Sequence, residues 1–172
     1  KNILTSSADS LKNIKYVSTN KHVQNHLSAL REYTRGNLDN ARDILETSHR
    51  EDRYNIYNAS LMSDILWAQG NKENARKILE DVLEIYPNNN AISFQLLKQN
   101  IKDSIDLEQS VKKLNKIMLY NRNNPSAYKL LAEGYERTQE KYKAKLALIN
   151  FYRLKGNLPM AFRVIDDGLG SN

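Results

Sequence analysis

Residues 70–80 read G-N-K-E-N-A-R-K-I-L-E, and residues 36–46 read G-N-L-D-N-A-R-D-I-L-E. The two stretches are identical at eight of eleven positions, and their glycines lie 34 residues apart. A glycine can close a helix in the left-handed conformation, where it carries no Cβ penalty. Apolar residues follow each glycine at three- and four-residue spacing, which indicates an amphipathic helix. A period of this length is typical of helix pairs that stack into a solenoid.

Small residues mark the same place in each successive helix pair. They recur at intervals of 34, 35 and 34 residues, at Ala41, Ala75, Ser110 and Ala144. The longer interval places one inserted residue in the turn at residues 103–106, which has no glycine, and Ser104 or Asp106 is expected to cap the next helix. Ala161 follows Ala144 by only 17 residues. The helix over residues 141–154 is therefore predicted to belong to two successive pairs.

This pattern resembles the tetratricopeptide repeat (TPR) family. The resemblance implies an all-α fold, a right-handed α-solenoid of TPR-like helix hairpins with about nine helices, each roughly 11 to 15 residues long. The solenoid is predicted to occupy residues 21–172. Residues 1–20 are predicted to form a lead-in segment or a short docking helix.

Composition limits the remaining possibilities. The 172 residues include no cysteine, which excludes disulfides and thiolate sites, and no apolar run reaches the roughly 18 residues of a membrane span. The net charge of +6 comes entirely from residues 87–172, which hold 14 basic and 8 acidic residues. Such an asymmetry fits an anionic partner, but a solvated helix surface is the preferred interpretation.

Motifs that carry catalysis or bind a cofactor are missing from the sequence. There is no G-x-x-x-x-G-K-[ST], no G-x-G-x-x-G and no G-x-S-x-G. His22 and His26 have the histidine spacing of H-E-x-x-H, but valine occupies the place of the general-base glutamate. We expect neither a metal, nor a cofactor, nor catalysis from this chain.

The C-terminal part carries a narrower resemblance. Residues 128–135 (Y-K-L-L-A-E-G-Y), 144–152 (A-K-L-A-L-I-N-F-Y) and 156–161 (G-N-L-P-M-A) are similar to the last helices of BepA-like bacterial zinc metalloproteases. That resemblance implies an N-terminal catalytic half with an H-E-x-x-H helix. It also implies a C-terminal TPR half that handles outer-membrane proteins and their assembly machinery in the periplasm. Without H-E-x-x-H, this chain would be the non-catalytic half.

A binding groove is the functional feature that the repeat predicts. The first helix of each pair lines the concave surface of a solenoid, and aromatic and arginine side chains commonly supply the binding energy. The TPR pattern does not match the arrangement that clamps a C-terminal carboxylate, because Leu30 and Asp64 stand where amides are needed. Trp67 could equally belong to the core. The predicted groove residues are His26, Tyr33, Tyr57, Ser60, Asp64, Trp67, Phe94, Lys98, Lys129, Glu133 and Arg137.

The leading functional hypothesis is a non-catalytic scaffold that binds a partner protein or peptide in this groove. The first alternative is the partner-recruiting half of a secreted zinc metalloprotease involved in outer-membrane protein quality control. The second alternative is binding of nucleic acid or an anionic surface by residues 112–163, which contain 12 basic and 3 acidic residues. No aromatic-basic recognition motif supports it, so nucleic acid is the least favoured partner.

Overall fold

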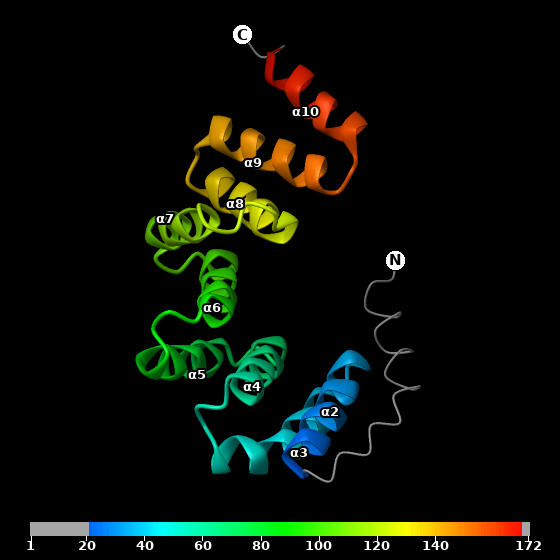
Figure 1. Cartoon of the computed structure of the whole chain (residues 1–172), viewed down its shortest axis with the longest axis vertical. Coiled ribbons are helices and arrows are strands. Elements are labelled where there is room, and N and C mark those ends of the chain that lie inside the picture. Colours follow the sequence, from blue (N-terminus) through cyan, green and yellow to red (C-terminus); the bar gives the residue numbers. More distant parts are fainter. Residues whose placement is uncertain (1–20, 170–172) are drawn as a thin grey trace. The chain divides into compact units, whose positions relative to one another are not determined.

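A computed structural model describes residues 21–169 and the side chains as far as Asp167; the predicted lead-in at residues 1–20 lies outside this range. Within residues 21–169 there are nine α-helices of 12 to 14 residues and no strand (Figure 1). The number and length of the helices confirm the prediction. The helices are α2 (Lys21–Thr34), α3 (Leu38–Glu51), α4 (Ile56–Ala68), α5 (Lys72–Ile85), α6 (Asn90–Asp103), α7 (Leu107–Met118), α8 (Pro125–Arg137), α9 (Lys141–Leu154) and α10 (Leu158–Leu169).

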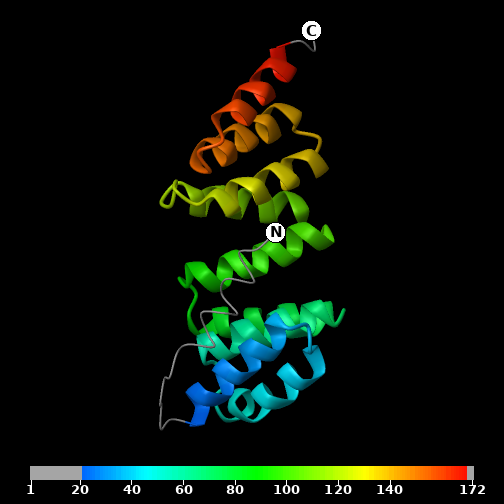
Figure 2. The same ribbon diagram turned by 90° about the vertical axis from the view of Figure 1, so that its right-hand side faces the viewer.

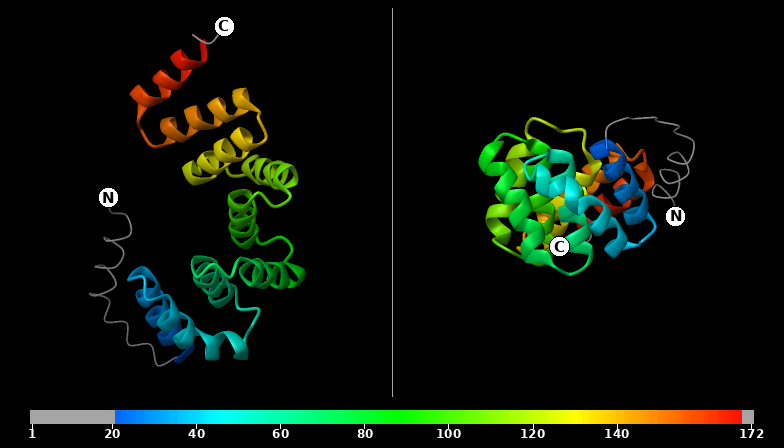
Figure 3. Two further views of the ribbon diagram at one scale, coloured as in Figure 1. Left: turned by 180° about the vertical axis from the view of Figure 1, so that it is seen from behind. Right: turned by 90° about the horizontal axis from the view of Figure 1, so that it is seen from below.

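The chain forms two compact units, the first ending at Ser93 and the second beginning at Phe94, inside α6. In the first unit α2 packs against α3, α3 against α4, and α4 against α5. In the second unit α7 packs against α8, α8 against α9, and α9 against α10. Figure 2 shows α8, α9 and α10 side by side, and Figure 3 shows the α2–α3 and α8–α9 hairpins from behind. As predicted, α9 belongs to two successive pairs, because the same kind of turn, with a left-handed residue, precedes it at Gln139 and follows it at Gly156.

Each unit has its own apolar core. Leu45 of α3 is fully buried in the first core, together with Ala29, Ala41, Leu61, Met62 and Ile65. The second core includes Leu97, Ile101, Val111, Leu114, Met118, Ala127, Leu130, Leu131, Tyr135, Ala144 and Ala147. The predicted small residues Ala41, Ala75, Ser110, Ala144 and Ala161 are all buried. Small side chains at these positions allow neighbouring helices to approach closely.

The turns between paired helices share one hydrogen-bond pattern. After α2, the N–H of Gly36 donates to the carbonyl of Tyr33, and the N–H of Asn37 donates to that of Glu32. This Schellman motif requires a left-handed residue after the helix. The left-handed residues are Gly36, Gly70 and Gly156 with φ of 84°, 85° and 69°, and also Ser104 and Gln139 with φ of 59° and 62°. Ser104 and Gln139 therefore adopt the left-handed conformation that glycine adopts in the other three turns.

The predicted insertion lies between Ser104 and Ser110. Six positions separate these residues, whereas five separate Gly70 from Ala75, and the extra residue is accommodated by a second left-handed residue, Asp106, with φ of 41°. The expected capping is wrong in detail. Asp106 precedes α7 but its side chain makes no capping hydrogen bond, because its left-handed backbone is not the extended conformation of a capping residue. Ser104 closes α6 instead of opening α7.

Gln139→Gly should raise the free energy of unfolding. A left-handed conformation costs a residue with a Cβ about 1–2 kcal/mol, and the added freedom of glycine in the unfolded chain offsets about 0.4–1 kcal/mol of that gain. We expect a net stabilisation of about 0.5–1 kcal/mol in urea denaturation followed by circular dichroism. Gly70→Ala is the matched control and should destabilise, because its open surroundings leave only the backbone strain. A loss of stability in Gln139→Gly would contradict this interpretation of the turn.

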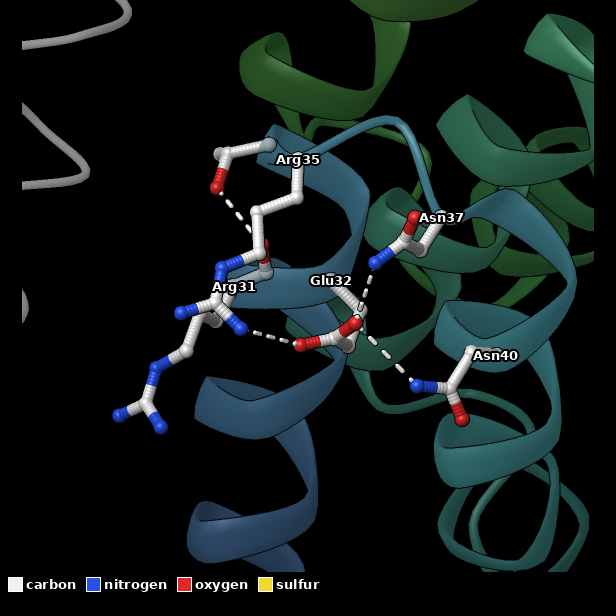
Figure 4. A network of polar contacts seen from close by, with 6 residues as sticks. Arg31, Glu32, Arg35, Asn37 and Asn40 are labelled. Atoms are coloured by element: carbon white, nitrogen blue, oxygen red, sulfur yellow. Dashed lines mark hydrogen bonds and ion pairs between the residues drawn. The ribbon is translucent and has the colours of Figure 1, made fainter.

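A carboxylate joins the end of α2 to the start of α3 (Figure 4). Glu32 Oε2 accepts hydrogen bonds from Asn37 Nδ2 at 2.8 Å and Asn40 Nδ2 at 3.2 Å, and Oε1 accepts from Arg35 Nη1 at 2.8 Å. The hydrogen bond from Asn37, followed by those from Asn40 and Arg35, lowers the pKa of Glu32 below its ordinary value. All three donors favour the ionised carboxylate.

The stability that Glu32 contributes should depend on pH. Because its pKa is lower in the folded state, the contribution is fully present above the ordinary glutamate pKa of about 4.3 and is lost as the pH falls through the folded value. We expect Glu32→Gln to have a lower urea midpoint than the wild type at pH 7. At pH 3 the two midpoints should converge, because the wild-type carboxyl is then becoming neutral too. A difference that does not change with pH would contradict the assignment.

None of the helices between residues 21 and 169 has both the length and the apolar character needed to cross a bilayer.

Candidate functional site

Four of the predicted groove residues lie on one face of α4. Tyr57, Ser60, Asp64 and Trp67 follow one another at three- and four-residue spacing, which places them along one side of a helix. Tyr57 is 75% exposed, and the other three are half-buried. The start of this helix is fixed by Asn55, whose Oδ1 accepts a hydrogen bond from the backbone N–H of Asn58.

Two predicted residues of α2 lie beside this face. His26 Nδ1 is 3.0 Å from Asn58 Oδ1, so the two side chains join α2 to α4. Burial, and then the nearby negative charge of Asp64, raises the pKa of Tyr33. The structure therefore brings the six predicted residues of the first unit onto adjoining parts of α2 and α4.

A pocket of about 230 Å³ opens between the N-terminal halves of α2 and α4. Its lining consists of His22, Val23, His26, Leu27, Asn55, Tyr57 and Asn58. Sites for drug-sized ligands measure about 300–1,000 Å³. This pocket is smaller, and it suits a single side chain of a partner protein better than a cofactor.

Trp67 lies between core and surface. Its ring is half-buried, and the Lys72 ammonium from the first turn of α5 lies 5.6 Å from the ring centroid. That distance is within the range of a cation–π interaction. The Trp67 ring thus contributes to the α4–α5 hairpin while part of its surface faces solvent.

Three of the five predicted residues of the second unit make contacts within the fold, and the other two are exposed. Phe94 packs against the second core, and Lys98 and Lys129 are exposed. The Lys102 ammonium donates to Glu133 Oε2 at 3.1 Å. Glu133 therefore already has a partner from α6.

Arg137 holds the end of α6. Its Nη1 donates to the backbone carbonyls of Ile101 and Lys102 at 2.8 Å each and lies 2.9 Å from Ser104 Oγ. The last carbonyls of a helix have no partner within that helix, and an arginine commonly satisfies them. These hydrogen bonds give Arg137 a structural role at the end of α6.

Asn58 is the residue that sequence reasoning missed. It is buried, it contacts His26, and it lines the pocket. The position 34 residues later is occupied by Ile92, which is also buried. A buried amide needs hydrogen-bond partners, so an asparagine at a position that is apolar in the two later pairs, at Ile92 and Ala127, was the available signal.

The two histidines of α2 point to different partners. His22 Nε2 lies 3.5 Å from Glu51 Oε2, whereas His26 contacts Asn58. Across the described part of the chain, no group of three His, Asp or Glu side chains is placed to hold a metal ion.

Comparisons with known proteins identify the fold. The family model of the tetratricopeptide repeat matches residues 33–101. The structure of MamA from residue 41 to its end, from Desulfovibrio magneticus RS-1, is 17% identical, with a TM-score of 0.68 over 88% of this chain and 94% of that chain. MamA of AMB-1 is 15% identical, with a TM-score of 0.63 over 83% and 94%. A search of curated proteins found no match.

These similarities confirm the predicted fold class, an all-α array of TPR-like helix hairpins. At this level of identity, the likeness to MamA concerns the fold alone. The narrower resemblance to BepA-like metalloproteases finds no support in these matches and stays a prediction.

Proposed function

We propose that this chain is a protein-interaction scaffold that binds a partner polypeptide along the α2–α4 face of its first unit. TPR-like arrays offer extended surfaces for binding proteins. The observation that supports this choice of face is the position of Tyr57, which is 75% exposed at a pocket shared by α2 and α4. Tyrosine and tryptophan are enriched among residues that dominate binding energy.

The spacing of the two aromatic residues defines the length of the partner segment. Tyr57 and Trp67 are ten residues apart on α4, which corresponds to about 15 Å along the helix axis. An extended chain covers this distance with about four or five residues. The partner segment therefore carries two apolar side chains four or five residues apart, one for the pocket beside Tyr57 and one for the open part of the Trp67 ring.

Polar groups between the two aromatic residues orient the bound segment. Ser60 and Asp64 lie on the same face of α4 and are half-buried. Both can accept hydrogen bonds from the backbone N–H groups of an extended segment. An aromatic residue at each end with acceptors between them fits a peptide better than a rigid folded surface.

Site-specific photo-crosslinking tests this proposal. A photoreactive phenylalanine analogue at position 57 should capture a partner polypeptide from native extract, and mass spectrometry identifies it. The matched control is position 142, because Tyr142 of α9 is also a tyrosine that is 75% exposed. Equal capture at positions 57 and 142 would count against the face.

Binding of the purified partner provides the quantitative test. Tyr57→Ala should weaken the affinity about thirtyfold, which corresponds to a dominant residue worth about 2 kcal/mol. Tyr142→Ala should leave the affinity unchanged. An unaltered affinity in Tyr57→Ala would refute the proposed site.

The resemblance of residues 128–161 to BepA-like metalloproteases supports a narrower version of this function. In that version the partners are outer-membrane proteins or their assembly machinery, and a catalytic half accompanies the scaffold. An H-E-x-x-H helix encoded upstream of Lys1 would support it. A partner with no connection to outer-membrane assembly would argue against it.

A further inference from the structure

A pocket of about 310 Å³ lies between the C-terminal end of α3 and the middle of α5, within the first unit. Its lining consists of His49, Arg50, Arg53, Ile78 and Asp81. It shares no lining residue with the pocket between α2 and α4. Two guanidinium groups and one carboxylate therefore surround a space at the lower end of the sizes found for ligand sites.

Arg53 is held in position by two contacts. Its Nη2 donates to Asp81 Oδ2 of α5, and its guanidinium carbon lies 5.2 Å from the centroid of the Tyr54 ring. That distance is within the range of a cation–π interaction. A guanidinium has five N–H donors in a rigid plane, so the donors that Asp81 does not use are already oriented for a further acceptor.

Arg50 and His49 supply further donors. Arg50 is exposed and has no ion-pair partner in the part of the chain that the structure describes. His49 Nδ1 is buried and has no hydrogen-bond partner among the described residues. Burial, and then the charge of Arg53, lowers the pKa of His49, so its ring is neutral at pH 7. We place the proton of this neutral ring on Nε2, because a buried N–H without an acceptor is costly. The Nε2–H group is then a donor on a residue that lines the pocket.

The internal repeat indicates that the fold does not require a histidine here. His49 comes eight residues after the small residue Ala41. The equivalent positions after Ala75, Ser110 and Ala144 hold Leu83, Met118 and Tyr152. An apolar or aromatic side chain therefore serves at this position in the later pairs. A buried nitrogen without a partner is a cost to the fold, and residues that break a local rule in this way are expected at functional sites.

We propose that this pocket binds the side-chain carboxylate of a glutamate in an acidic segment of a partner protein. Guanidinium groups match the planar geometry of a carboxylate. With His49 neutral, the lining carries two positive charges and one negative charge, so one bound carboxylate brings the sum to zero. A phosphate group carries about −1.5 to −2 at pH 7 and would leave excess negative charge beside Asp81. Ile78, which packs against the first core, offers an apolar wall to the methylene groups of glutamate.

This chain is itself a poor source of the carboxylate. Its net charge of +6 opposes the approach of a second copy. Residues 1–20 contain a single acidic residue, Asp9, and residues 170–172 contain none. Charge complementarity therefore favours a different protein with an acidic segment.

The probe is Nα-acetylglutamate α-amide, in which the side chain is the only carboxylate. Its glutamine counterpart is the uncharged control, and inorganic phosphate is the alternative anion. In NMR titrations of the full chain at pH 7, the probe should shift the ring signals of His49 saturably. The expected dissociation constant is about 1 mM, which is ordinary for so small a ligand. The glutamine compound should not bind, and phosphate should bind more weakly than the probe.

Two variants test the residues, and one of them should gain affinity. Arg50→Gln should weaken binding about tenfold, as expected for the loss of a charge-assisted contact. Arg153→Gln is the matched control, because Arg153 follows Ala144 by nine residues as Arg50 follows Ala41, and it should leave binding unchanged. Asp81→Asn should tighten binding about threefold, because it removes the competing negative charge. Tighter binding is a result that an unfolded variant does not give.

Several results would overturn the proposal. Among them are equal shifts with the glutamate and glutamine compounds, the absence of a saturable shift, and Asp81→Asn binding no tighter than the wild type. Tighter binding of phosphate than of the probe would assign the pocket to phosphate instead. A gain of probe affinity in Asp9→Asn would show that the chain's own carboxylate fills the pocket. His49 shifts that follow protein concentration alone would identify a second copy as the occupant.

Discussion

Replacing Leu45 by alanine should lower the free energy of unfolding by about 2–5 kcal/mol. The Leu45 side chain is fully buried in the first core among residues of α2, α3 and α4. Its truncation removes buried apolar contacts and leaves a cavity, because helices held by many other contacts collapse only partly into the space. Urea denaturation monitored by circular dichroism measures the loss as a lower midpoint.

Ile165→Ala is the matched control because Ile165 occupies the same repeat position in α10, four residues after the small residue Ala161. Its side chain is 37% exposed, so the expected loss is about 1 kcal/mol or less. The contrast between the two variants tests whether burial, and not the repeat position itself, sets the cost. Losses of equal size would show that burial does not set the cost.

Gly134→Val should destabilise the second unit by about 1–3 kcal/mol, the usual cost of overpacking a core. A Cβ atom at Gly134 would lie 2.5 Å from Val111 Cγ2 on α7. Val111 is buried, and a β-branched side chain has few alternative rotamers in a helix. The glycine therefore permits the close contact between α7 and α8.

A double-mutant cycle isolates this contact. Gly134→Ala alone should destabilise, because its methyl group meets Val111. In the Val111→Ala background the same change should stabilise, because the clash is gone and alanine favours a helix over glycine by about 1 kcal/mol. The coupling between the two positions should amount to about 0.5–3 kcal/mol. Additive effects in denaturant titrations would refute the assigned role of Gly134.

The helices could be predicted from the sequence because their signals are local. At Gly36 the helix ends through two local hydrogen bonds, from the N–H of Gly36 to the carbonyl three positions earlier and from the N–H of Asn37 to the carbonyl five positions earlier. Apolar spacing likewise reports the buried face within a few turns. Repetition then reinforced each signal, since Ala41 and Ala75 mark the same contact in two pairs. The insertion before Ser110 could also be predicted, because it lengthens one interval between small residues from 34 to 35 and leaves the rest of the repeat unchanged.

Contacts between distant residues were not readable from the sequence. Gln139 stands five residues before Ala144, where the other pairs have glycine, but the residue types of Ser104 and Gln139 do not indicate that they adopt the glycine conformation. Arg137 resembles a groove ligand until its contact with Ser104, 33 residues away, shows that it holds α6. The pairing of Gly134 with Val111 likewise exists only once two helices have met.

The shared role of α9 has a consequence for how this chain can change in length. Because α9 is joined to α8 and to α10 by the same kind of turn, the array advances from Ala144 to Ala161 by one helix and not by one hairpin. An insertion or deletion of about 17 residues is therefore tolerable there, half of the usual increment of a TPR array. Each such step would reverse the direction in which the following segment of the chain leaves the array.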